Sequence, residues 1–199
     1  MLKMRFFDIL IASIFLIIAC PFFIILSILI WTSGSKPFFK HKRVGLNGKE
    51  FYCLKFTSMK GLNEIEEAEQ ERVIFELDHF GKVNNDPRVT KIGKLMRKIS
   101  VDELPQVFNI LKGDMSWIGP RPVTTDRPLS EYDQKRKDRL KVKPGITGYT
   151  QAYYRNNISQ EDKLALDAKY AQKVTFLGDL KIFFKTIETV VCRKNVYTN

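Results

Sequence analysis

Histidine and cysteine are scarce in this chain. Its 199 residues include two histidines, His41 and His79, and three cysteines, Cys20, Cys53 and Cys192. The cysteines form no CxxC pair, which argues against a zinc site and against a disulfide framework. Two histidines are also too few for a histidine-rich metal cage. Carboxylates therefore remain as the main candidates for chemistry.

Acidic residues are also in deficit, with 22 Asp and Glu against 33 Lys and Arg and a formal net charge of +11. Nucleic acids, anionic lipids and phosphorylated substrates would all be attracted to such a chain. The N-terminus is strongly apolar, which favours a membrane surface with anionic lipids over nucleic acid as the partner. The length suits one domain with an anchor.

The apolar N-terminal segment contains no charged residue from Ile9 to Trp31, which is 23 positions. About 20 residues suffice to cross a bilayer, so a single spanning helix is one interpretation. Pro21 lies near the middle of the segment, where it removes a backbone hydrogen bond and favours a helix break. Both flanks are basic, which places both on the cytoplasmic side by the positive-inside rule. The basic residues of the flanks are Lys3, Arg5, Lys36, Lys40, Lys42 and Arg43.

A re-entrant helix that breaks at Pro21 and returns to the same face satisfies both observations. We therefore predict a membrane-inserted segment over residues 1–35 and a catalytic domain on the cytoplasmic face over residues 36–199. A lipoprotein signal peptide with Cys20 as the lipidated residue is disfavoured, because ten more apolar or small residues follow Pro21. Asp8 is expected to cap the helix or to pair with a basic flank.

The remaining sequence predicts an α+β fold that is mostly helical. Asn47-Gly48 indicates a hairpin turn with a return strand over residues 51–56. Helices are expected over residues 63–79, 89–99, 102–111, 160–173 and 179–192, with Gly113 ending the third. The second and last are amphipathic and carry basic residues, so each can pack on the core or lie at a membrane interface.

The most informative stretch is residues 100–106, which contain the adjacent carboxylates Asp102 and Glu103. Ser100 and Glu103 match a helix capping box, and taken alone the pair is explained better by capping than by catalysis. The surrounding residues favour chemistry: Arg97 lies one helical turn upstream, and Arg121 stands between two prolines downstream. Arginine suits phosphate oxygens. A carboxylate can hold Mg²⁺ with phosphate oxygens, or attack phosphorus as a nucleophile.

A second group of polar residues follows the glycine-rich turn at residues 143–148. Gln151 is followed by two tyrosines, Arg155 and Asn156. Aromatic rings and an arginine could together receive a uracil ring and a diphosphate. Each fragment alone is a weak signal, because tyrosine clusters usually belong to a core.

Taken in order, these residues resemble the small monotopic phosphoglycosyl transferases of bacterial glycan assembly. The resemblance covers most of the chain, and its central block is highly specific. The matching segments are the apolar segment with its proline, Lys55-Phe56-x-Ser58-Met59, Asp86-Pro87-Arg88-Val89-Thr90-x-x-Gly93, Ser100-x-Asp102-Glu103-Leu104-Pro105-Gln106, Asn109-x-Leu111-x-Gly113-Asp114-Met115-Ser116, Gly119-Pro120-Arg121-Pro122, Pro144-Gly145-Ile146-Thr147-Gly148, Gln151 and Arg155-Asn156.

The resemblance implies a protein of the bacterial inner membrane with a re-entrant helix, interfacial helices and Mg²⁺ as cofactor. It implies transfer of a sugar-1-phosphate from a UDP-sugar to undecaprenyl phosphate, with release of UMP. Asp102 would be the nucleophile that forms an aspartyl-phosphosugar intermediate, and would help hold Mg²⁺. Glu103 would assist at the metal or handle a proton. The residues implied in phosphate or substrate binding are Lys55, Arg97, Arg121, Gln151 and Arg155.

The sequence departs from the family pattern at Thr57, where a basic residue is usual, and at Tyr153-Tyr154, where Asn-Gly is usual. Two other functions therefore stay open: a membrane-tethered basic module that binds lipid or a partner without catalysis, and a degenerate scaffold. The sequence leaves open the sugar, the glycan pathway and whether the chain belongs to a longer protein. It also leaves open whether it forms homo-oligomers.

Overall fold

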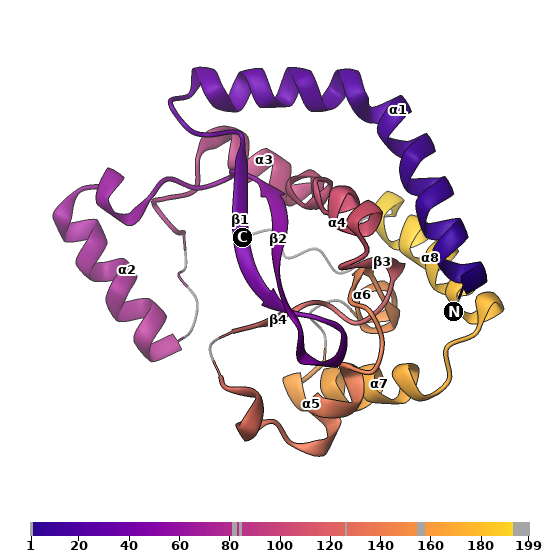
Figure 1. Cartoon of the computed structure of the whole chain (residues 1–199). Helices are drawn as coiled ribbons and strands as arrows, with labels where there is room; N and C mark the ends of the chain where they lie inside the picture. Colours follow the sequence, from indigo (N-terminus) through magenta and orange to yellow (C-terminus); the bar gives the residue numbers. More distant parts are fainter. Residues whose placement is uncertain (1, 81–82, 84, 126, 155–157, 193–199) are drawn as a thin grey trace. The chain divides into compact units, whose positions relative to one another are not determined.

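A computed structural model describes residues 2–80, 83, 85–125, 127–154 and 158–192 of the chain. The chain forms two compact units, and each unit is built from separate stretches of the sequence. The first unit contains residues 1–20, 40–54 and 105–199, and the second contains residues 21–39 and 55–104. The fold is α+β and mostly helical, as predicted (Figure 1). Arg155 lies outside the described residues, so its predicted role stays a prediction.

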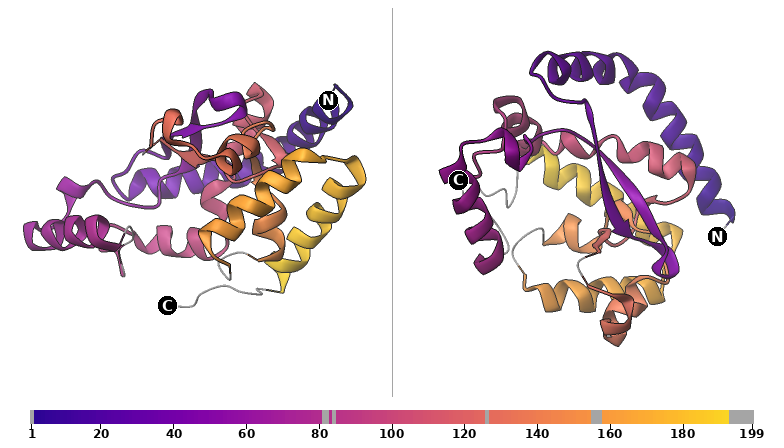
Figure 2. Two further views of the ribbon diagram at one scale, coloured as in Figure 1. Left: turned by 90° about the horizontal axis from the view of Figure 1, so that it is seen from below. Right: turned by 60° about the vertical axis from the view of Figure 1, so that its left-hand side comes forward.

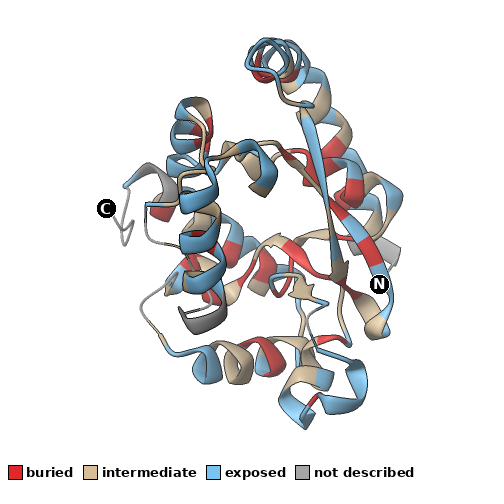
Figure 3. Ribbon diagram, turned by 90° about the vertical axis from the view of Figure 1, so that its left-hand side faces the viewer, coloured by how far each residue is buried: buried red, intermediate tan, exposed pale blue. Residues whose placement is uncertain are grey.

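Helix α1 (Leu2–Thr32) forms from the apolar N-terminal segment. By length and composition it is the one helix among the described residues that could cross a membrane. Most of its apolar side chains are exposed, and only single positions such as Ala12 and Ile30 are buried (Figure 3). The backbone is helical on both sides of Pro21, yet the division between the two units falls between Cys20 and Pro21. The re-entrant path of this helix stays a prediction.

Each half of α1 packs within its own unit. In the first unit, Arg5 donates hydrogen bonds to the carbonyl oxygens of Ile110 and Leu111 at the end of α4 (Gln106–Lys112). In the second unit, the ring of Phe23 lies 5.1 Å from that of Phe56. The segment that is expected to enter the membrane is therefore also part of the protein's packing.

The predicted hairpin is confirmed. Strands β1 (Phe38–Val44) and β2 (Glu50–Phe56) flank a turn, η1 (Leu46–Gly48). Asn47 and Gly48 both take positive φ angles, 53° and 81°, as this turn chemistry requires. A short strand, β4 (Val123–Thr124), pairs antiparallel with β1 and gives the sheet order β2-β1-β4.

The second unit is mostly helical beyond the ends of the hairpin. Thr90 caps α3 because its side chain accepts a hydrogen bond from the backbone N–H of Gly93. The expected helix over 89–99 is confirmed with slightly narrower bounds, and the solvated helix expected over 63–79 begins later than predicted. The elements of this unit are η2 (Leu62–Glu64), α2 (Glu67–Phe80), α3 (Lys91–Lys98) and η3 (Val101–Glu103).

In the first unit, α6 packs against both α7 and α8, and α5 packs against α7 (Figure 2). Strands β3 and β5 form a parallel pair that no sequence pattern indicated. The predicted helices over 160–173 and 179–192 are confirmed as α7 and α8. The remaining elements of this unit are β3 (Ser116–Ile118), η4 (Leu129–Glu131), α5 (Gln134–Arg139), β5 (Gly145–Thr147), α6 (Tyr149–Tyr153), α7 (Gln160–Gln172) and α8 (Phe176–Val191).

Candidate active site

The two adjacent carboxylates lie in a tight turn between two helices. Asp102 and Glu103 belong to η3, which follows Ser100 in the left-handed conformation at φ 59° and ψ 24°. The Ser100 side chain makes no capping hydrogen bond, so the capping box that the sequence suggested does not form. The expected helix over 102–111 is also wrong in its start, because α4 begins only after Pro105. Capping therefore does not account for the acidic pair.

Glu103 is paired with the lysine that the sequence singled out. Lys55 Nζ lies 2.7 Å from Glu103 Oε1, and the two side chains are only 18% and 17% exposed. Lys55 comes from β2 and Glu103 from η3, so a contact across 48 residues of sequence fixes the acidic turn onto the strand. A charge-assisted hydrogen bond of this length holds both groups in place.

Asp102 is a carboxylate in an unfavourable electrostatic setting. Burial raises the pKa of Asp102 above its ordinary value, and the neighbouring Glu103 raises it further. Lys55 and Arg97 act in the opposite direction but do not cancel these two causes. When ionised, Asp102 is therefore poorly solvated, which is the condition of a reactive or cation-seeking carboxylate.

Arg97 projects from the last turn of α3 and is held by a serine. Its Nε donates to Ser58 Oγ at 2.9 Å, while the arginine as a whole stays exposed. Ser58 is buried, and its carbonyl oxygen accepts a hydrogen bond from Thr90 N at 3.2 Å. Helix α3 lies so close to this carbonyl that a Cβ at Gly93 would meet it at 2.0 Å. The guanidinium is thus fixed through one nitrogen.

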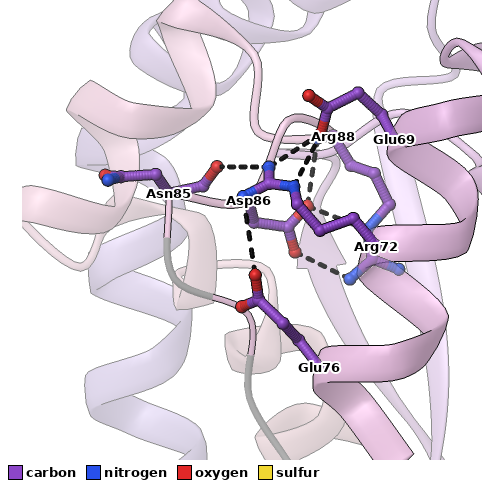
Figure 4. Close-up of polar contacts among 6 residues, drawn as sticks. All are labelled: Glu69, Arg72, Glu76, Asn85, Asp86 and Arg88. Atoms are coloured by element: carbon purple, nitrogen blue, oxygen red, sulfur yellow. Dashed lines mark hydrogen bonds and ion pairs between the residues drawn. The ribbon is translucent and has the colours of Figure 1, made fainter.

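The Asp86-Pro87-Arg88 segment forms a structural turn beside this site. Arg88 Nε and Nη2 donate to the two oxygens of Asp86 at 2.9 and 2.7 Å (Figure 4). Burial alone would raise the pKa of Asp86, but the side-chain and backbone hydrogen bonds from Arg88 lower it below its ordinary value. Arg72 of α2 pairs with Glu69 and donates to the carbonyl oxygen of Asn85 at 3.4 Å. This network shapes the loop that leads into α3.

The structure therefore brings four of the predicted site residues together in the second unit: Lys55, Arg97, Asp102 and Glu103. Two others belong to the first unit. Arg121 is exposed between β3 and β4. Gln151 lies on α6, where its Nε2 donates to the Ile146 carbonyl at 3.1 Å and its Oε1 is buried with no partner among the described residues.

The acidic turn fits Mg²⁺ when a phosphate supplies further ligands. Among the described residues there is no cluster of three metal-ligating side chains. Mg²⁺ commonly needs only one or two carboxylates, because it keeps waters and takes oxygens from substrate phosphates. Proximity to Glu103 and burial both disfavour the negative charge of Asp102, and a divalent cation would relieve both.

Three structural features escaped the sequence analysis. Asp8 lies inside α1 beyond its first turn, and its Oδ1 accepts hydrogen bonds from Ser116 Oγ and Trp117 N at 2.9 and 3.2 Å. Ser58 was noted only as part of the Lys55-Phe56-x-Ser58-Met59 motif, and its hydrogen bond with Arg97 was not predicted. A buried pair between α5 and α7 left no sequence signal, since isolated charges on helices are usually solvated.

Comparison with known proteins identifies the relatives of this chain. Residues 1–193 match the family described as bacterial sugar transferase. The exopolysaccharide production protein ExoY of Rhizobium meliloti is 39% identical over 200 residues, which cover 97% of this chain and 87% of that protein. The undecaprenyl-phosphate galactose phosphotransferase of Salmonella typhimurium is 40% identical across 97% of this chain and 41% of its own length. The undecaprenyl-phosphate glucose phosphotransferase of Komagataeibacter xylinus is 31% identical across 99% of this chain and 37% of its own length.

Proposed function

Because the chain belongs to the bacterial sugar transferase family, we propose that it transfers a sugar-1-phosphate from a UDP-sugar to undecaprenyl phosphate and releases UMP. The activities after which the Salmonella and Komagataeibacter relatives are named support the acceptor and the class of reaction. The chain spans less than half of those two proteins, so the exact donor and acceptor belong to the proposal. The single observation that carries it is Asp102 in a tight turn, partly buried and flanked by Lys55 and Arg97.

The chemistry assigns Asp102 as the nucleophile. One Oδ attacks the phosphorus that bears the sugar, and the bond from that phosphorus to the UMP oxygen breaks, so UMP leaves with the electron pair. The result is an aspartyl-phosphosugar. An oxygen of undecaprenyl phosphate then attacks the same phosphorus, the aspartyl oxygen leaves, and the carboxylate is restored. Two steps allow the donor and the lipid acceptor to bind in turn.

The neighbouring residues of the second unit stabilise charge on the transferred group. Lys55 and Arg97 both act electrostatically on Asp102, and positive charge near developing oxyanions lowers the barrier. Glu103, paired with Lys55, keeps that lysine beside Asp102. Mg²⁺ bound beside the diphosphate would neutralise part of its charge and would make UMP a better leaving group. Asp102 would help hold the ion. We assign Arg121, Gln151 and Arg155 to substrate binding on the strength of the family resemblance.

The proposed location follows from the chemistry and the anchor. Undecaprenyl phosphate is a membrane lipid, and α1 is apolar and largely exposed. We propose that the protein resides in the bacterial inner membrane with its catalytic residues on the cytoplasmic face. Anionic lipids would attract its net positive charge.

The test is UMP release by nanodisc-embedded protein with Mg²⁺ across a panel of UDP-sugars, with and without undecaprenyl phosphate. One sugar should support release, and Asp102→Asn should reduce turnover on the order of 10⁴-fold or more. With donor labelled in the sugar phosphate and no acceptor, the wild-type protein should retain covalent label and Asp102→Asn should not.

The matched control is Glu161→Gln, which changes an exposed carboxylate on α7 and should leave turnover unchanged. Retained activity in Asp102→Asn would refute the nucleophile. If folded wild-type protein releases no UMP with any UDP-sugar of the panel, the transferase proposal is refuted and a binding module or scaffold is favoured.

A further inference from the structure

A buried ion pair joins two helices of the first unit. Arg139 at the end of α5 and Asp167 in the middle of α7 meet with Nη2 2.7 Å from Oδ2. The two side chains are 11% and 3% exposed. Burial raises the pKa of Asp167 and lowers that of Arg139, so each charge is costly to keep in this place.

Stability alone is a poor explanation for this pair. Desolvation of two charges commonly offsets their attraction, and well-packed apolar residues of similar volume are often as stable or more so. Arg139 Nε is buried with no hydrogen-bond partner among the described residues, which adds to the cost. The pair therefore calls for a second role.

The same two side chains make one further hydrogen bond each, and both lead to predicted substrate-binding residues. Arg139 Nη2 also donates to the carbonyl oxygen of Arg121 at 2.9 Å. Asp167 Oδ1 accepts from Thr150 Oγ1 at 3.0 Å, a bond that is buried. Thr150 directly precedes Gln151 in α6. One buried pair thus holds the backbone of the Arg121 loop on one side and α6 on the other.

The loop that carries Arg121 is suited to this kind of anchoring. Pro120 and Pro122 restrict the backbone on both sides of the arginine, which leaves few torsions to fix. The Arg121 side chain is exposed and projects from this restricted backbone. A charged donor on the Arg121 carbonyl fixes that backbone more strongly than a neutral donor would.

We propose that Arg139 and Asp167 are positioning residues, which hold the Arg121 loop and α6 in the geometry that binds the anionic donor substrate. This inference rests on the proposed function, because Arg121 is assigned there to the substrate. Arg139 and Asp167 themselves touch no substrate. They act by fixing the backbone positions from which the side chains of Arg121 and Gln151 project.

The main test replaces both charges at once. Arg139→Met with Asp167→Leu removes the pair without stranding a charge, so the thermal midpoint in nanodiscs should be equal or higher. Misplacement of a binding residue by about 1 Å can cost about 10²-fold in rate. We expect kcat/KM for the UDP-sugar to fall by about that factor, with a rise in KM carrying much of the loss.

The coupling to Arg121 is measured by a double-mutant cycle. Arg121→Ala should lower kcat/KM strongly in the wild-type background and several-fold less in the Arg139→Met/Asp167→Leu background. A purely structural pair would leave the effect of Arg121→Ala unchanged. The matched control is Lys135→Met with Glu161→Gln, which removes an exposed ion pair between the same two helices and should change neither quantity.

Failure of the inference and failure of the proposed function give different results. If Arg121→Ala alone has no effect, the assignment of Arg121 to the substrate is wrong. If Arg121→Ala is harmful but the folded pair variant has wild-type kcat/KM, the positioning role is refuted. Should the pair variant fail to fold, Arg139→Lys decides, because the shorter lysine side chain keeps the charge but withdraws the donor that Nη2 offers to both acceptors. Full activity of Arg139→Lys would refute the inference, and a raised KM would support it.

Discussion

At the scale of single residues, Asp102 combines reactivity with a cost in stability. The pKa of Asp102 is raised in the folded protein above its ordinary value of about 3.9. At a pH between these two values, the folded state therefore binds more protons than the unfolded chain. The free energy of unfolding therefore falls as pH rises through that window. Above it, the full cost of the desolvated charge is present. A carboxylate that served only stability would not be placed where burial and a neighbouring carboxylate disfavour its charge.

Asp102→Asn should for this reason separate stability from activity. Because it removes a desolvated charge, we expect the thermal midpoint at neutral pH to rise slightly while turnover is lost. The gain should shrink as the pH falls through the raised pKa of Asp102, where the wild-type carboxyl group becomes protonated. Thermal unfolding in nanodiscs from about pH 4 to pH 7.5 measures this. A midpoint that drops equally at every pH would contradict the electrostatic account.

Lys55 opposes the raised pKa of Asp102 and also holds Glu103. Lys55→Met should raise the pKa of Asp102 further, because it removes an attractive charge and frees a repulsive one. The acid limb of the pH profile of kcat/KM should therefore move to higher pH, beyond any uniform loss of rate. Lys60→Met, an exposed lysine of the same unit, is the control and should leave the limb in place. If the acid limb of the kcat/KM profile stays in place in Lys55→Met, the assignment of that limb to Asp102 is contradicted.

The sequence singled out four residues that lie close together in the structure, but it did not indicate the contacts that bring them together. Lys55, Arg97, Asp102 and Glu103 were all identified from motifs, and they meet in the second unit. The capping box was wrong because Ser100 takes a left-handed conformation, which no sequence pattern of serine indicates. The Lys55–Glu103 pair spans 48 residues and depends on how η3 meets β2, which local spacing does not determine.

At the scale of elements, helix α3 is placed by close backbone contact. A Cβ at Gly93 would lie 2.0, 2.7 and 2.9 Å from the O, C and Cα atoms of Ser58. On an isolated helix, Gly93→Ala should stabilise by about 1 kcal/mol. Here the clash is with backbone, which cannot turn aside as a flexible side chain can. We expect a net loss of about 1–3 kcal/mol or more in stability.

The same substitution should also lower kcat/KM, because it pushes α3 away from the serine that holds Arg97. Lys94→Ala, the next residue and an exposed one, is the matched control and should be close to neutral. Thermal unfolding and UMP release on the two variants measure both effects. A more stable Gly93→Ala protein would show that α3 is free to shift.

Elements with local signals were predicted well. The Asn47-Gly48 turn and the Gly113 stop both take the positive φ angles that their residue types favour. The elements missed were those set by distant contacts. Pro105 splits the expected helix over 102–111 into η3 and α4, and β3 pairs with β5 although each has only three residues. Strands so short carry no usable periodicity.

At the scale of the whole molecule, the N-terminal segment links the two units. Composition predicted its apolar helix, and the proline in its middle was the only sign of a division. The structure assigns the two halves of α1 to different units at Pro21. The sequence could not show this, because the N-terminal half of α1 contacts the distant residues Ile110 and Trp117 of the first unit, and the C-terminal half contacts Phe56 of the second.

The path of α1 through the membrane gives the last prediction. Basic residues flank both ends of the apolar segment, and such residues are retained on the cytoplasmic side. If the helix enters one leaflet and returns, Lys3→Cys and Lys36→Cys should both react with a membrane-impermeant maleimide from the cytoplasmic side. The background would carry Cys20→Ser, Cys53→Ala and Cys192→Ser so that only the introduced thiol reacts. Lys112→Cys, exposed in the catalytic part, marks the cytoplasmic face in the same inverted vesicles. Labelling of position 36 with protection of position 3 would instead establish a spanning helix. That result would leave the chemistry of Asp102 unchanged but would put the N-terminus on the opposite side of the membrane.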